Sequence, residues 1–317
     1  MNKALSYIKE NTWIWALIGS TILWLAMGIS SGQLGFSSLI SNANTAAFLA
    51  IMAFGQMLVV TSGRGAIDLS IPGVLTLMAF ISMSIINGKN SMIVPAFIAV
   101  IAICAAIGFI NSLLVIYLQI PAIIATMAMN YILTTAALLI NKHFSIFTVA
   151  PVLKAFLKGK IFGIYFSIIL AILLGVFCWF LLRKTSYGKS LLALGQNKNA
   201  ASLAGVKTAR VEMVTYILCS VLTGIAGILV SARVGSAVLG MGDTYTMDTV
   251  ASIVIGGTLI SGGRANVPGT LVGCLFLGLI SAAMQVIGCS VGAQNIAKGA
   301  LIILVLMLGT FQKKSAK

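Results

Sequence analysis

The residues that could carry chemistry in this chain are few and widely spaced. Five acidic residues, one histidine and five cysteines occur among 317 residues. The cysteines show no CxxC or Cys/His spacing, so a metal or redox motif is not indicated. No nucleophile–base pair or paired carboxylates emerge, and no G-x-x-x-x-G-K-[ST] run that could cradle ATP occurs. The sequence argues against an enzyme, and it predicts no metal and no cofactor bound by this chain itself.

The acidic residues also argue against a carrier driven by protons or sodium, because such carriers place ionisable groups at mid-membrane depth. Asp68 and Asp248 each stand immediately before an apolar run. A carboxylate there can cap free N–H groups and meet the positive end of the helix dipole, so both are expected to cap helix starts. His143 lies in a basic outer loop without a partner in the sequence, and we expect a solvated or lightly packed imidazole.

The elements that must position these residues are apolar. Hydrophobic residues make up 60% of the chain and charged residues 8%, and the mean hydropathy is +1.10. A soluble domain carries about 25% charged residues, so this chain has too little polar surface to coat a soluble globule. We predict an integral membrane protein. The net charge of +15 lies in loops and termini, where it fixes orientation, and no aromatic-and-basic patch indicates nucleic acid.

A membrane-spanning helix needs roughly 20 apolar residues. On this measure we expect an all-α protein with about ten transmembrane helices, in one domain over residues 1–317. The eighth span is short and rich in glycine, so nine spans are also compatible with the sequence. The distribution of lysine and arginine favours both termini in the cytosol. The expected spans are 12–29, 42–61, 68–87, 91–117, 121–140, 161–183, 211–232, 248–262, 266–287 and 292–311.

One polar stretch, residues 184–210, interrupts the apolar second half of the chain. It carries five basic residues, and Gly188, Gly195 and Gly205 bracket two short helix-like pieces. A basic, glycine-punctuated segment between two long apolar spans is expected to be a cytoplasmic loop. This pattern suggests a segment that a cytosolic partner holds.

A short internal echo and several polar residues inside spans complete the pattern. SGRGAIDLSIPGVL around position 68 resembles SGGRANVPGTLV around position 268, and both fall at expected cytoplasmic turns, which is weak support for an internal repeat. Unpaired polar groups are costly in lipid, so polar residues within spans should face the bundle or a pore. Each is a candidate for either a pathway contact or an interhelical hydrogen bond: Asn111, Thr126, Asn130, Thr134 and Gln285.

The second half of the chain also resembles a known family. YGKSLLALGQNKNAASLAGVKTARVEMVTYILCSVLTGIAGIL and the following TMDTVASIVIGGTLISGGRANVPGTLVG are similar to the permease subunit of ribose-type (monosaccharide or autoinducer-2-like) ABC importers, in the branched-chain amino acid/ribose permease superfamily. The shared elements are a basic AxGxNxxAAxLAGV loop, a span with a Gly-x-x-Gly tail, and an Asp before ASIVIGGT. Upstream, residues 67–70 (IDLS) resemble the family's G-I-D-L-S turn. The resemblance begins near residue 36 and is most specific in the C-terminal half.

The resemblance implies the ABC importer permease fold and a set of partners. These are a cytosolic ABC ATPase that holds ATP and Mg²⁺, an extracytoplasmic sugar-binding protein, and a second permease, either another copy or a related chain, all at the inner membrane of a prokaryote. The loop 184–210 would then couple the permease to the ATPase. The basic outer residues Lys142, Lys154, Lys158 and Lys160 are a candidate docking surface for the binding protein. The expected coupling residues are Gly188, Lys189, Leu191, Leu192, Leu194, Gly195, Asn197, Ala200, Ala201, Leu203, Gly205 and Val206.

The expected function is therefore ATP-driven import of a monosaccharide or related small polyol. A branched-chain amino acid permease and an ATPase-independent facilitator or channel are the alternatives; a structural scaffold fits less well. The chain departs from the family where Ile71, Pro72 and Gly73 follow the IDLS turn, and where residues 63–66 (GRGA) precede it. These departures bear on which sugar is carried.

Overall fold

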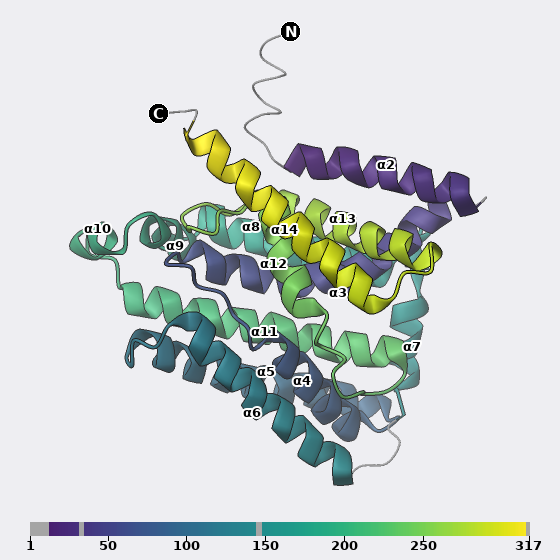
Figure 1. The fold of residues 1–317 in the computed structure, drawn as a ribbon. Helices are drawn as coiled ribbons and strands as arrows, with labels where there is room; N and C mark the ends of the chain where they lie inside the picture. The colour runs from purple at the N-terminus through teal and green to yellow at the C-terminus, as the bar shows by residue number, and fades with distance from the viewer. Residues whose placement is uncertain (1–12, 32–34, 144–147, 315–317) are drawn as a thin grey trace.

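The computed structural model describes residues 13–31, 35–143 and 148–314, and Figure 1 shows their arrangement. Both termini, expected in the cytosol, lie outside the described residues, as does the side chain of His143. A two-stranded antiparallel hairpin, β1 (Lys160–Ile161) with β2 (Ile164–Tyr165), is a small exception to the expected all-α architecture. The helical elements are α2 (Trp13–Ser31), α3 (Phe36–Thr61), α4 (Ile71–Ile86), η1 (Asn90–Met92), α5 (Ile93–Ile116), α6 (Ala122–His143), α7 (Pro151–Lys158), α8 (Phe166–Lys184), α9 (Ser186–Gln196), α10 (Lys198–Leu203), α11 (Thr208–Val234), α12 (Tyr245–Ile255), α13 (Val267–Val286) and α14 (Val291–Lys314).

Each of the ten expected spans overlaps one helix of the structure. Six described helices are long and apolar enough to cross a membrane by length and composition, and three shorter apolar helices accompany them. Several expected boundaries were wrong. The span placed at 248–262 is α12, which ends at Ile255, and the span placed at 68–87 begins only at Ile71. The span placed at 42–61 begins earlier, at Phe36, and the span placed at 161–183 begins later, at Phe166.

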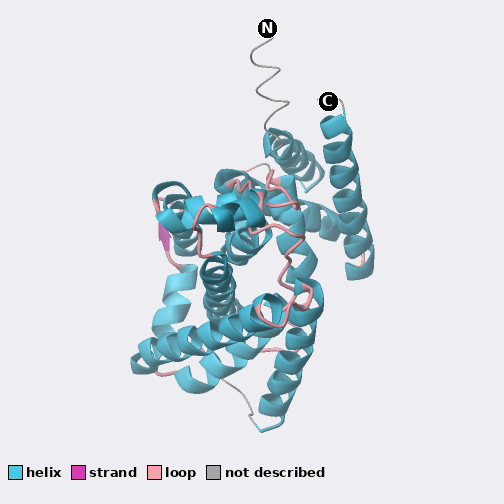
Figure 2. Cartoon of the chain, turned by 90° about the vertical axis from the view of Figure 1, so that its left-hand side faces the viewer, coloured by secondary structure: helices cyan, strands magenta, loops and turns pink. Residues whose placement is uncertain are grey.

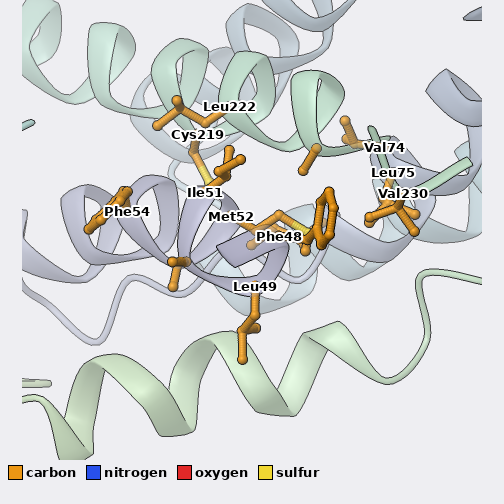
Figure 3. Packing of buried hydrophobic residues seen from close by; sticks show 14 of the residues in the cluster. Phe48, Leu49, Ile51, Met52, Phe54, Val74, Leu75, Cys219, Leu222 and Val230 are labelled. Atoms are coloured by element: carbon orange, nitrogen blue, oxygen red, sulfur yellow. The ribbon is translucent and has the colours of Figure 1, made fainter. Parts of the chain in front are cut away.

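The core lies where α11 packs against α3, α4 and α5 (Figure 3). Close approach of these helices depends on glycine. A Cβ on Gly55 of α3 would lie 2.8 Å from the Cα of Cys219 on α11, and a Cβ on Gly108 of α5 would lie 2.6 Å from the carbonyl oxygen of Tyr216. Backbones that touch in this way gain dispersion energy that apolar side chains alone do not supply in lipid.

Two helices of the bundle are discontinuous. α12 has 11 residues, about 16 Å at 1.5 Å per residue, which is about half of a bilayer's ~30 Å hydrocarbon core. α4 is preceded by a turn and an irregular segment, residues 62–70, that run from beside α9 into the body of the bundle (Figure 1). The starts of α4 and α12 meet, because the Gly242 amide donates to the Thr76 hydroxyl and a Cβ on Gly242 would lie 2.3 Å from the Pro72 carbonyl oxygen.

The two ends of the bundle carry different structures. The short helices α9 and α10 project at one end, and the view onto that end shows the loops that gather beside them (Figure 2). α7 and the β-hairpin lie at the opposite end (Figure 1). The molecule therefore has one end built by residues 184–210 and another built by residues 148–165.

Candidate functional site

Residues 184–210, the coupling loop from here on, fold into two short helices with separate caps. The Thr185 hydroxyl accepts from the Gly188 amide at 3.2 Å and starts α9. The Asn197 side chain accepts from the Ala200 amide at 3.0 Å and starts α10. Side-chain oxygens at these positions satisfy backbone donors that a helix start leaves free, so the loop has a defined shape.

The two helices differ in what they bury. Gly188, Leu191 and Leu194 of α9 are buried within this chain, as is Ala201 of α10. Leu192 and Val206 are partly buried, whereas Lys189, Ala200 and Gly205 are exposed. Leu203 at the end of α10 is 90% exposed. The leucines of α9 therefore serve internal packing, and the apolar side chain open to a partner is on α10.

Side chains tie the coupling loop to α11. The hydroxyls of Tyr187 and Thr215 lie 2.8 Å apart. Burial raises the pKa of Tyr187, the Thr215 contact opposes this rise, and the phenol stays neutral. Lys198 of α10 pairs with Glu212 at 2.6 Å, although partial exposure of Lys198 weakens the pair.

A glycine junction, formed by Gly63, Gly195, Gly262 and Gly263, joins the coupling loop to two other turns. The Gly263 amide donates to the Thr61 carbonyl at 3.0 Å. A Cβ on Gly195 would lie 2.0 Å from the Thr61 oxygen and 2.4 Å from the Gly263 nitrogen, and one on Gly262 would lie 2.3 Å from the Gly63 Cα. Backbone thus meets backbone among the end of α9, the α3–α4 turn and the α12–α13 turn.

The two echoing sequence segments meet at this junction. Both continue into a helix that opens with proline and glycine, and both of these glycine amides are capped by an asparagine side chain. Gly269 donates to Asn266, its own N-cap, at 3.1 Å, whereas Gly73 donates to Asn130 of α6 at 2.7 Å. The expected repeat therefore has equivalent local geometry, although the cap of the first copy comes from a distant helix.

The irregular segment before α4 and the first turn of α4 are held by polar side chains of neighbouring helices. The Leu69 amide donates to the Thr126 hydroxyl at 2.9 Å, and Asn111 donates to the Ser70 hydroxyl at 3.0 Å. Asn111, Thr126 and Asn130, three of the candidate pathway residues, thus converge on residues 67–73 and contact the protein's own backbone or side chains there. Thr134 is exposed on α6, and Gln285 is exposed near the end of α13, apart from this group.

Asp68 does not cap a helix that begins at residue 68, because residues 66–70 form no regular element and α4 begins at Ile71. Its Oδ1 atom instead accepts from the amide and the hydroxyl of Ser70 at 2.8 and 2.6 Å. Its side chain lies against Cys219, the twelfth of the 27 residues of α11. A fully buried carboxylate therefore lies level with the middle of a span, where the sequence gave reason to expect none.

Asp248 lies inside the first turn of α12 and not at its N-cap, so its carboxylate is near the positive end of the helix dipole. Its carboxylate pairs with Lys298 of α14 at 2.9 Å, and both side chains are largely buried. Sequence reasoning missed this pair, because Lys298 stands alone in an apolar stretch. It also missed Gln56 of α3, whose side-chain oxygen accepts from the Asp68 amide at 3.2 Å; a glutamine inside an apolar run was the available signal.

A cavity of about 580 Å³ opens at the end of the bundle that carries the coupling loop. It lies between the α3–α4 turn, the α5–α6 turn and the first turns of α10 and α11. Arg64, Lys198, Glu212 and Tyr216 are among the residues that line it. No group of three or more His, Cys, Asp or Glu side chains gathers within residues 13–31, 35–143 and 148–314.

A bundle of apolar helices with two discontinuous members and a structured loop at one end defines a polytopic membrane transport subunit. Residues 38–307 match the family described as the permease component of the branched-chain amino acid transport system. The ribose import permease of Escherichia coli is 32% identical over 264 residues, which cover 82% of this chain and 81% of that protein. This chain belongs to that family of ABC import permeases. It is a multi-pass membrane transport subunit of a bacterial ABC importer and not itself a catalyst.

Two further relatives are named as permeases for other sugars. The galactose/methyl galactoside import permease of Haemophilus influenzae is 26% identical over 346 residues, covering 100% of this chain and 98% of that protein. The L-arabinose ABC transporter permease of Azospirillum brasilense is 26% identical over 258 residues, covering 80% and 74%. No solved structure matches this chain. The family match and these relatives confirm the resemblance drawn from the sequence motifs.

Proposed function

We propose that this chain forms the membrane pathway of an importer for a monosaccharide or related small polyol. An extracytoplasmic binding protein delivers the solute, and a separate cytosolic ATPase binds ATP and Mg²⁺. The chain acts as one domain of about ten spans with both termini in the cytosol, paired with a second permease. The similarity to ribose, galactose and arabinose permeases supports this assignment of substrate class.

The observation that carries the proposal is the exposed helix α10. Leu203 is 90% exposed at its end, with Lys207 and Arg210 exposed beside it. An isolated apolar side chain among basic residues fits a groove with an apolar floor and an acidic rim. We assign α10 as the segment that enters the ATPase and α9 as the arm that connects it to the bundle.

The glycine junction connects this arm to two turns of the bundle. Because Gly195 contacts the Thr61 carbonyl and the Gly263 amide without intervening side chains, a shift of α9 is passed to both turns directly. The turns continue into α4 and out of α12, the two discontinuous helices. Closure of the ATPase pair would therefore change the tilt of both helices together, a rigid-element movement of the kind that switches access.

The coupling assignment is tested by pull-down of a tagged full-length chain from native membranes in mild detergent, with co-purifying proteins identified by mass spectrometry. Leu203→Asp should abolish recovery of the ATPase, because the substitution puts a charge into an apolar contact. The matched control is Leu118→Asp, at an exposed leucine in the α5–α6 turn at the same end. Equal recovery of an ATPase by the wild type and Leu203→Asp would refute the assignment of α10.

Branched-chain amino acids are the second candidate substrate, because the matching family is described by them. Uptake of labelled ribose, galactose, arabinose and leucine into cells that express the complete transporter separates the two. Sugar uptake that unlabelled leucine leaves unchanged is the expected result. Solute movement by the purified chain alone in liposomes would instead establish the facilitator.

A further inference from the structure

The Asp68 carboxylate lacks a compensating positive charge. The two ion pairs of the described chain, Lys198–Glu212 and Lys298–Asp248, do not include it. Its Oδ1 atom holds both Ser70 donors, while its Oδ2 atom is buried and accepts no N–H or O–H hydrogen bond from the described residues, with the Cys219 thiol as its neighbouring weak donor. The start of α4 contributes only about half an elementary charge through its dipole. An ionised carboxylate here would be costly unless a cation joined it.

Further oxygen atoms around this carboxylate are also without partners. Within the described part of the chain, Asn111 Oδ1, the Tyr216 hydroxyl and Ser220 Oγ are buried and make no hydrogen bond. Asn111 reaches Ser70, which holds Asp68, and Tyr216 interacts electrostatically with Asp68. Ser220 follows Tyr216 by four residues and therefore lies on the same face of α11. α4, α5 and α11 pack on one another, and a Cβ on Gly108 of α5 would lie 2.6 Å from the carbonyl oxygen of Tyr216. Asn111, three residues after Gly108, lies on the same face of α5.

Oxygen atoms with unused lone pairs around a single carboxylate are suited to a hard, singly charged cation. An ionisable residue level with the middle of a span, beside a broken helix, marks an ion site in other membrane proteins. We propose that Asp68, Asn111, Tyr216 and Ser220 form a buried binding site for one monovalent cation, either a proton or a metal ion such as Na⁺. The site stands on this geometry and is independent of the solute that the importer carries.

The cavity at the coupling-loop end comes close to the site. Ala66 and Tyr216 both line that cavity. Ala66 precedes Asp68 by two residues, and Tyr216 interacts electrostatically with Asp68. The titratable groups that face Asp68 are Tyr216 and Cys219 of α11. In the described structure, the groups that the other packed helices bring to the Asp68 region are neutral: Gln56 of α3, Asn111 of α5 and Thr126 of α6. Lys198 and Glu212, which line the cavity, pair with each other.

The test measures the thermal midpoint of the full-length chain in lipid nanodiscs from acid to alkaline pH, in sodium chloride and in choline chloride at equal ionic strength. A bound proton predicts a midpoint that falls as pH rises, equally in both salts, together with the infrared carbonyl band of a protonated acid. A bound Na⁺ predicts a midpoint that rises with Na⁺ over choline at alkaline pH, because a ligand that binds the folded state stabilises it.

Asp68→Asn keeps the acceptor for Ser70 and removes the charge, so it should lose both responses and the infrared band. Asp243→Asn, at an exposed aspartate of the α11–α12 connection, should behave as the wild type. Identical pH and Na⁺ responses in Asp68→Asn and the wild type would overturn the proposal. If Asp68→Asn does not fold, Tyr216→Phe decides. It removes one oxygen of the site and should shift the midpoint pH or weaken the Na⁺ response, and an unchanged response overturns the site.

Discussion

Substitution of Gly195 by alanine tests whether the coupling loop drives the two turns that it touches. The added Cβ would lie 2.0 Å from the Thr61 carbonyl oxygen, whereas real Cβ contacts essentially never fall below 3.0 Å. The end of α9 must therefore withdraw by about 1 Å or more, a displacement that also strains the hydrogen bond from the Gly263 amide to Thr61. Neither opposing atom belongs to a flexible side chain, so neither can turn aside.

The expected cost follows from these contacts. Overpacking of this kind destabilises by about 1–3 kcal/mol, and a weakened backbone hydrogen bond adds about 1 kcal/mol. The bundle itself should survive, because the junction lies at its end and the α3–α4–α5–α11 core is untouched. Coupling should not survive: we expect solute-stimulated ATP hydrolysis to fall about tenfold, within the ~1–3 kcal/mol that typically links distant sites.

The assay is solute-stimulated ATP hydrolysis by the transporter complex that co-purifies with the tagged chain, reconstituted in proteoliposomes. Gly235→Ala, at the C-cap of α11 and outside the coupling loop, is the matched control. Its φ of +91° makes alanine cost about 1 kcal/mol, but no atom lies within 4 Å of the added Cβ. Stimulation that Gly195→Ala and Gly235→Ala retain equally would refute transmission through the glycine junction.

Two further predictions concern polar contacts within the bundle. Lys298→Ala should lower the free energy of unfolding by about 3–5 kcal/mol, because it leaves Asp248 buried without its partner; thermal midpoints should show the loss, and the double variant Asp248→Asn with Lys298→Met should recover most of it. Asn130→Ala should cost about 1–3 kcal/mol, since the Gly73 amide loses its acceptor. Thr135→Ala, which removes an exposed hydroxyl of the same helix, should leave the thermal midpoint unchanged, and an equal loss in both variants would contradict the capping role.

The sequence allowed the helices to be placed because each long apolar run has one stable solution in lipid. It did not reveal that residues 66–70 are not helical, since Ala66, Ile67 and Leu69 are as apolar as the helix that follows. The irregular backbone is tolerated because Gln56 and Thr126, on two other helices, accept from the Asp68 and Leu69 amides. A pattern local to the chain contains no trace of that arrangement.

The same limit explains the site residues. The basic, glycine-bracketed loop was recognisable, because charge and glycine are local signals. The sequence did not reveal that Leu191 and Leu194 are buried whereas Leu203 is exposed. The three leucines look alike in the sequence, but they have different surroundings in the fold. Gly195 was expected to bracket a short helix, and its contacts make it a point of close backbone approach as well.

The side chains that accept hydrogen bonds from the amides at the start of α4 also constrain the order of events during biosynthesis. Leu69 and Gly73 each depend on a side chain that follows 57 residues later in the chain. At about 5–20 residues per second, a ribosome needs roughly 3–11 s to supply those partners. During that interval the broken segment has to wait in the aqueous channel of the insertion machinery or under a chaperone, because its free amides cannot enter lipid. Truncation before residue 126 should therefore yield a nascent chain whose third apolar stretch stays accessible to water-soluble labels.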